Sequence, residues 1–174
     1  MKSTHLFALI STLSVFGCGI FGLGDCGDAE RAPIPQLQPE KLTIQEGVWG
    51  QLSFWEGDFS PTTPELACRR GTVVAVQRVV LVYEPTLGSM ATVSAENLSL
   101  LSDVSTTAVD SVWSDATGFF ELAVPPGDYS IFVREDGFLY TWTGAGQRSV
   151  FDPVAVASGQ IILIGIQIRY KATS

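Results

Sequence analysis

The side chains that could carry out catalysis are few in this chain of 174 residues, and their placement does not favour it. The single histidine, His5, lies in an apolar N-terminal leader, so a Ser-His-Asp or Cys-His arrangement would lack its base in the mature protein. The acids of residues 110–136 fall at turns or on outward strand positions, which favours solvated acids over a catalytic pair. No Asp-x-Asp-x-Asp-Gly run predicts a calcium loop, and no histidine is left for a zinc site. We therefore expect no enzymatic activity, cofactor or metal.

Aromatic side chains are better candidates for a binding site. β-Sandwich proteins bind saccharides on exposed rings flanked by polar groups, and an exposed aromatic strip can equally be a protein-docking face. The alternative is that the rings cover sheet edges or pack beneath loops, because tryptophan is usually mostly buried. Phe132 has the outward parity of its expected strand, which makes it a candidate for exposure. The candidate aromatic ligand platform comprises Trp55, Trp113, Phe132, Tyr140 and Trp142.

The charge balance excludes one class of partner. The formal net charge is −8, and the ten basic residues form no cluster longer than Arg69-Arg70. Nucleic-acid-binding proteins carry a basic patch or stripe that neutralises phosphates. We therefore expect no nucleic-acid partner.

The N-terminus has the pattern of an export signal. Lys2 supplies a positive charge, and residues 6–23 contain no charged side chain. Within them, Val15-Phe16-Gly17-Cys18 resembles the lipobox of bacterial lipoproteins, which implies removal of residues 1–17 and acylation of Cys18. The protein is then expected to be exported and lipid-anchored to the bacterial membrane, at the outer membrane or cell surface, with the membrane as a partner through the lipid. Ordinary cleavage near Gly24 and an uncleaved anchor are the alternatives.

The segment after the leader is expected to be a flexible tether over residues 18–45. It contains glycines, aspartates and three prolines with weak periodicity, a composition typical of spacers. With Cys18 lipidated, Cys26 and Cys68 remain as an even pair in an oxidising compartment. They form either a disulfide between the tether and the domain or two unrelated thiols.

The clearest structural signal lies in residues 110–135. Residues 115–118 have Asp first and Gly fourth, which indicates a type I turn, and residues 125–128 (Pro-Pro-Gly-Asp) suit a type II turn. Even-numbered residues from 120 to 124 and odd-numbered ones from 129 to 133 are large and apolar. This period-2 alternation predicts strands with one buried face, arranged as a three-strand antiparallel meander.

The rest of the domain, residues 46–172, is expected to supply a second sheet. Its strands should be short and separated by turns, with no amphipathic helix, which predicts an all-β antiparallel sandwich of about seven strands. Residues 85–105 are expected to be a loop with a short strand or a turn of helix. The other expected strands are 47–55, 73–84, 106–113, a short edge strand at 138–143, 150–157 and 160–171.

Five short motifs occur in order along this domain: Gly47-x-x-Gly50-x-Leu52, Asp115-x-x-Gly118-x-Phe120-x-Leu122, Pro126-Gly127-x-Tyr129-x-Ile131-x-Val133, Glu135-x-Gly137 and Pro153-Val154-x-Val156-x-x-Gly159. Their order and spacing resemble the carboxypeptidase regulatory-like domain, a transthyretin-like (prealbumin-like) Greek-key sandwich. Members of that family usually sit beside an enzyme or a transporter, and fold alone does not set activity. The motifs say little about activity. Because the catalytic arrangements are disfavoured and the N-terminus has an export signal, we expect a structural or protein-interaction module at the cell envelope, with a carbohydrate-binding module as the alternative. Its partner would be an envelope protein or a glycan.

Overall fold

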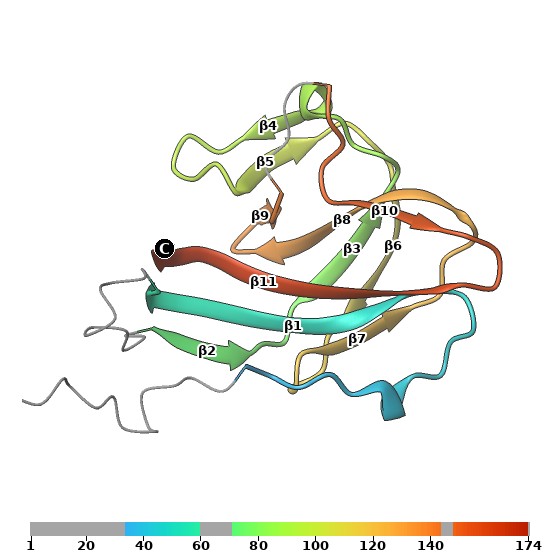
Figure 1. The fold of residues 1–174 in the computed structure, drawn as a ribbon. Coiled ribbons are helices and arrows are strands. Elements are labelled where there is room, and N and C mark those ends of the chain that lie inside the picture. The colour runs from blue at the N-terminus through green and yellow to red at the C-terminus, as the bar shows by residue number, and fades with distance from the viewer. Residues whose placement is uncertain (1–33, 60–70, 144–147, 174) are drawn as a thin grey trace, which may run out of the picture.

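The computed structural model describes residues 34–59, 71–143 and 148–173 of the chain. Within these ranges the regular elements are strands and two short 3₁₀ turns, with no α-helix, so the all-β prediction is confirmed. The strands form two sheets, one of four and one of seven strands, which face each other as a β-sandwich (Figure 1). The elements are η2 (Pro39–Lys41), β1 (Gly47–Asp58), β2 (Thr72–Ala75), β3 (Val79–Tyr83), η4 (Gly88–Met90), β4 (Ala91–Val93), β5 (Leu100–Val104), β6 (Ala108–Trp113), β7 (Phe119–Leu122), β8 (Gly127–Glu135), β9 (Phe138–Tyr140), β10 (Pro153–Val156) and β11 (Ile161–Thr173).

The four-stranded sheet is built around β1. Strand β11 pairs with one edge of β1, and β2 and β7 share its other edge. The seven-stranded sheet has the order β4-β5-β9-β8-β3-β6, with β10 also paired to β8. All pairs are antiparallel except β1 and β11, the first and last strands, which run parallel side by side (Figure 1). The expected antiparallel pairing is therefore correct for every pair but this one.

The predicted meander of residues 110–135 is wrong. Strand β6 pairs with β3, β7 pairs with β1 in the opposite sheet, and β8 pairs with β3. The predicted turn at Asp115 does form, closed by a hydrogen bond from Gly118 N to Asp115 O of 2.9 Å. The turns therefore carry the chain across the sandwich rather than between neighbouring strands. Alternation determines which side chains face inward, but it carries no information on which strand becomes the neighbour.

Two other predicted strands also differ from the structure, because the alternation of side chains does not show which strands become neighbours. Residues 73–84 form two strands, β2 and β3, that belong to different sheets. The chain crosses between them at Val76–Arg78, where the buried Ser114 hydroxyl accepts the Arg78 N–H and donates to Val76 O, both at 2.9 Å. Strand β9 was expected at an edge, but it lies between β5 and β8. Both features depend on contacts with distant residues.

The core lies between the two sheets, and its inward faces match the predicted alternation. Phe120 and Val124 from one segment and Tyr129, Ile131 and Val133 from the next all pack into it, with Leu122 partly buried against them. Even-numbered residues of β11 complete the layer from the opposite sheet. The remaining fully or mostly buried members are Val48, Leu52, Val80, Val82, Tyr140, Val156, Ile164, Ile166 and Ile168.

Residues 34–45, which were expected to belong to the tether, make specific contacts with the sandwich. Lys41 Nζ lies 2.6 Å from Asp115 Oδ2, and Thr43 donates its backbone N–H and its hydroxyl to the Glu121 carboxylate. Slight desolvation opposes ionisation of Asp115, but hydrogen bonds from Lys41, Thr117 and Phe119 outweigh it and lower its pKa to about 2. This part of the segment therefore lies along β7.

Candidate functional site: a cleft at the edge of β11

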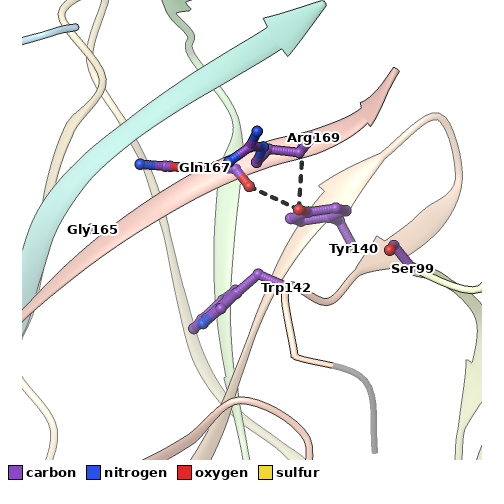
Figure 2. A pocket seen from close by; sticks show the side chains of 6 residues that line it. All are labelled: Ser99, Tyr140, Trp142, Gly165, Gln167 and Arg169. Atoms are coloured by element: carbon purple, nitrogen blue, oxygen red, sulfur yellow. Dashed lines mark hydrogen bonds between the residues drawn. The ribbon is translucent and has the colours of Figure 1, made fainter. Parts of the chain in front are cut away.

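The candidate site is a cleft where β11 passes the end of β9 (Figure 2). Its volume is about 320 Å³, enough for a large side chain or a single sugar ring. Two of the predicted aromatic residues line it together with polar groups from the last strand. The lining residues are Ser99, Tyr140, Trp142, Gly165, Gln167 and Arg169.

Tyr140 joins the two sheets at this point. It ends β9, and its ring is buried in the core with 3% exposure. Its hydroxyl donates to Gln167 O at 2.7 Å and accepts the backbone N–H of Arg169 at 3.1 Å, as Figure 2 shows. Burial raises the pKa of Tyr140, so the phenol stays protonated and remains a donor. The tyrosine hydroxyl thereby makes the hydrogen bonds to the edge of β11 that a neighbouring strand would otherwise make.

Trp142 is positioned by a buried carboxylate. Trp142 N donates to Asp152 Oδ2 at 3.2 Å, and Thr143 N donates to Asp152 Oδ1 at 2.7 Å; the Thr143 hydroxyl also donates to Oδ1. Asp152 is almost completely buried and has a positive φ of 39°. These bonds fix the backbone that carries the half-buried indole into the wall of the cleft.

We expect Asp152 to make stability depend on pH. Burial raises its pKa from 3.8 to about 6, although hydrogen bonds from Thr143 and Thr141 oppose the shift. Between these values the folded state retains a proton that the unfolded state has released, so stability falls as pH rises from about 4 to 6. At about 1.36 kcal/mol per pKa unit, the fall attributable to Asp152 is about 1–3 kcal/mol. Urea unfolding of wild type and Asp152→Asn at pH 4, 5, 6 and 7 measures it; parallel curves for the two proteins would contradict this assignment.

Arg169 brings a positive charge to the cleft. Its guanidinium lies 4.8 Å from the centre of the Trp55 ring and 5.9 Å from that of Phe59, and its Nη1 is 3.5 Å from Gln167 Oε1. The ion pairs among the described residues involve Lys41 and Arg78, and none involves Arg169. The guanidinium is therefore held by aromatic faces while it remains without an acidic partner in the described part of the chain.

The predicted aromatic residues do not gather on one surface. Trp55 and Tyr140 lie near the cleft but are buried, and Trp142 is half-buried in its wall. Trp113, on β6 of the seven-stranded sheet, is 66% exposed. The expectation that Phe132 is exposed is wrong: its exposure is 0%. A second apolar cluster covers that face of β8, formed by Leu81, Leu101, Phe132, Leu139 and Phe151.

One acid expected to be solvated is also buried. Glu135 at the end of β8 is 2% exposed, with Oε1 2.6 Å from Arg78 Nε and Oε2 3.1 Å from the Tyr170 hydroxyl. Burial and the nearby Glu135 raise the pKa of Tyr170 to about 12. This arrangement neutralises a buried charge at the end of the core, and no second carboxylate takes part in it.

Four of the residues that line the cleft, Ser99, Gly165, Gln167 and Arg169, were not predicted as site residues. The alternation in the last strand places Gly165, Gln167 and Arg169 on the face opposite the core isoleucines, which was the available signal. Only the tertiary structure brings these positions to Trp142. The predicted lipidation site Cys18 and the possible disulfide pair Cys26 and Cys68 lie outside the described residues.

Among the described residues, no helix has the length and apolar character needed to cross a bilayer. In the same ranges, His, Cys, Asp and Glu side chains form no group of three or more that could hold a metal ion. Comparison of the chain with protein-family models, with curated proteins and with solved structures finds no match.

Proposed function

We propose that this protein is a non-enzymatic interaction module, exported and held to a bacterial membrane by lipid on Cys18. The proposal takes its fold family, the transthyretin-like carboxypeptidase regulatory-like domain, from the order of the turn and strand motifs in the sequence. The two facing sheets are compatible with that family. Its partner would be another protein of the cell envelope.

The observation that carries the interaction role is the composition of the β11 cleft. Trp55 and Phe132 are used in packing, so they offer no face to a ligand, and Tyr140 lines the cleft with an exposure of only 3%. In contrast, the half-buried Trp142 lines the cleft together with Arg169, a cation without an acidic partner among the described residues. Tryptophan and arginine are among the residue types enriched in protein-interaction hot spots.

The interaction role is tested by crosslinking in intact cells. A photoreactive amino acid at Gln167, inside the cleft, is expected to crosslink to one discrete envelope protein. The matched control places the same group at Ser111, an exposed position on β6 of the other sheet, where no such product should form. Equal products from both positions, or none from Gln167, would contradict a binding role for the cleft.

Carbohydrate binding is the second candidate, and one observation favours it. Trp142 lies in the cleft with the planar polar groups of Gln167 and Arg169, the combination with which proteins hold a sugar ring. If this role holds, polysaccharide affinity gels retard the wild type, and Trp142→Ala weakens binding at least about tenfold. Absence of retardation on every polysaccharide tested would reject it.

The anchor has its own test. Cells labelled with radioactive palmitate should incorporate label into the wild type and none into Cys18→Ala, because the thiol is the expected site of acylation. Equal labelling of both proteins would end the lipoprotein assignment and leave the cleft unaffected.

A further inference from the structure

We propose that the free edge of β11 binds an extended peptide segment of a partner protein as an added β-strand, with an acidic side chain of that segment paired to Arg169. The inference rests on the proposed interaction function and names the chemical class of its partner. Three features support it: the backbone of β11, the glycine at position 165 and the positive charge of Arg169 in the cleft.

Part of the β11 edge is already occupied by the protein itself. The Tyr140 hydroxyl bonds Gln167 O and Arg169 N, and the Asn97 side chain donates to Tyr170 O at 3.4 Å. Backbone groups of alternate residues in a strand point to the same edge. The N–H and C=O groups of Leu163 and Gly165 therefore point toward the same side as those of Gln167 and Arg169.

The intervening residues point the other way. A Cβ placed on Gly50 of β1 would lie 1.8 Å from Ile164 O, so that carbonyl faces β1. Among the described residues, no side chain or loop backbone hydrogen-bonds to the backbone of Leu163 or Gly165. With respect to the described residues, these groups form an open strand edge, which is a template for another strand.

Gly165 has no role inside the domain that requires a glycine. Its φ lies outside the left-handed region, and an added Cβ would meet nothing within 4 Å. Glycine weakens a strand because it loses more conformational freedom on folding than other residues. In a strand interior it often marks a place where another backbone approaches closely. The open edge on either side of Gly165 is such a place.

The cleft supplies the side-chain contacts for an added strand. It adjoins Gly165 and takes one side chain of the segment against Trp142. Tyr140 closes the edge at Gln167, so the open part spans residues 161–166, about 20 Å at the usual rise of about 3.3 Å per residue. Among the described residues that line the cleft none is acidic, and Arg169 is the only charged one. An acidic side chain is therefore the complement that the segment must carry.

Amide hydrogen exchange measured by NMR tests the open edge in the free protein. Leu163 and Gly165 are expected to exchange at least about 100-fold faster than Ile162 and Ile164, whose amides pair with β1. Equal protection of all four amides would show that the edge is already covered, and it would overturn the proposal.

A synthetic peptide tests the added strand. The probe is a seven-residue peptide of alternating valine and threonine with a central glutamate, and it should protect the Leu163 and Gly165 amides from exchange. The same peptide N-methylated at alternate residues should not bind, and replacement of its glutamate by lysine should weaken binding about fivefold or more.

Two substitutions at one position provide the matched pair in the protein. Gly165→Ala keeps the edge N–H and adds only a methyl, which meets no atom of the domain but crowds the approaching backbone, so binding should weaken by no more than about threefold. Gly165→Pro removes that N–H, which makes no bond within the sheet, and should weaken binding at least about tenfold. If the proline variant does not fold, the N-methylated peptide still tests the backbone pairing.

The outcomes separate this inference from the proposed function. If Gln167 crosslinks to a protein in cells but the peptide neither binds nor protects the edge amides, strand addition is overturned and the interaction role stands. If a polysaccharide binds and no protein crosslinks, both are overturned in favour of the carbohydrate-binding alternative. Binding of the N-methylated peptide as tightly as the unmodified one would also reject backbone pairing.

Discussion

Tyr129→Ala is expected to lower the free energy of unfolding by about 3–5 kcal/mol, the usual cost of truncating a buried aromatic residue. Tyr129 follows the Pro-Pro-Gly turn at the start of β8, and its ring packs in the core between the sheets. Its hydroxyl donates to Pro125 O at 2.7 Å, so the ring also closes the turn that precedes it. Removal of the ring leaves a cavity and frees that turn. Urea unfolding followed by tryptophan fluorescence measures the loss.

Tyr129→Phe is the matched control for this prediction. It keeps the ring and loses only the hydrogen bond to Pro125, so its cost should be about 1 kcal/mol. A loss below about 1 kcal/mol for Tyr129→Ala itself, the size of an ordinary surface change, would mean that β8 does not face the core as described.

The second large effect is expected at Gly50→Ala, with a loss of about 3 kcal/mol or more. A Cβ at this position would lie 1.8 Å from Ile164 O and 3.1 Å from the Phe120 ring. The first contact is with backbone, so it can be relieved only if β1 and β11 move apart. Forcing extra atoms into a packed site costs about 1–3 kcal/mol in general, and a shift of the pairing between the first and last strands adds to it.

Gly165→Ala is the control for this effect because it makes the same chemical change on the neighbouring strand. Its Cβ would meet nothing within 4 Å, so stability should stay unchanged or rise by up to about 1 kcal/mol as the unfolded chain loses freedom. Thermal unfolding of both variants beside the wild type makes the comparison. Similar melting temperatures for Gly50→Ala and Gly165→Ala would contradict the close approach of β1 and β11.

Both variants bear on function, because β11 supplies both the wall of the core and the edge of the cleft. Its even-numbered residues, such as Ile166 and Ile168, pack inward. Its odd-numbered residues Gly165, Gln167 and Arg169 line the cleft. The substitution at Gly50 therefore tests how the strand is held, whereas the substitutions at Gly165 test what it binds.

The candidate site was only partly predictable. Trp142 and Tyr140 were singled out because exposed rings bind ligands, yet Tyr140 acts here through its hydroxyl on the edge of β11. Gln167 and Arg169 carried no motif, since polar residues on an outward strand face are ordinary. The error at Phe132 arose because alternation separates the two faces of a strand without showing whether the second face is covered.

The predicted type II turn at residues 125–128 is wrong, because Gly127 lacks the positive φ that this turn requires and instead begins β8. The amino-acid sequence by itself determined the other local features: the absence of amphipathic helices from the described residues, the turn at Asp115, and the inward faces of the segments around Phe120 and Ile131. These features depend on φ preferences and on a side-chain period of two residues, which act over a few neighbours. The tertiary structure alone decided that β7 crosses to β1, that β1 and β11 run parallel, and that an edge of β11 stays open beside Trp142. Strand partners are chosen by the packing of residues far apart in the chain, and no local pattern encodes that choice.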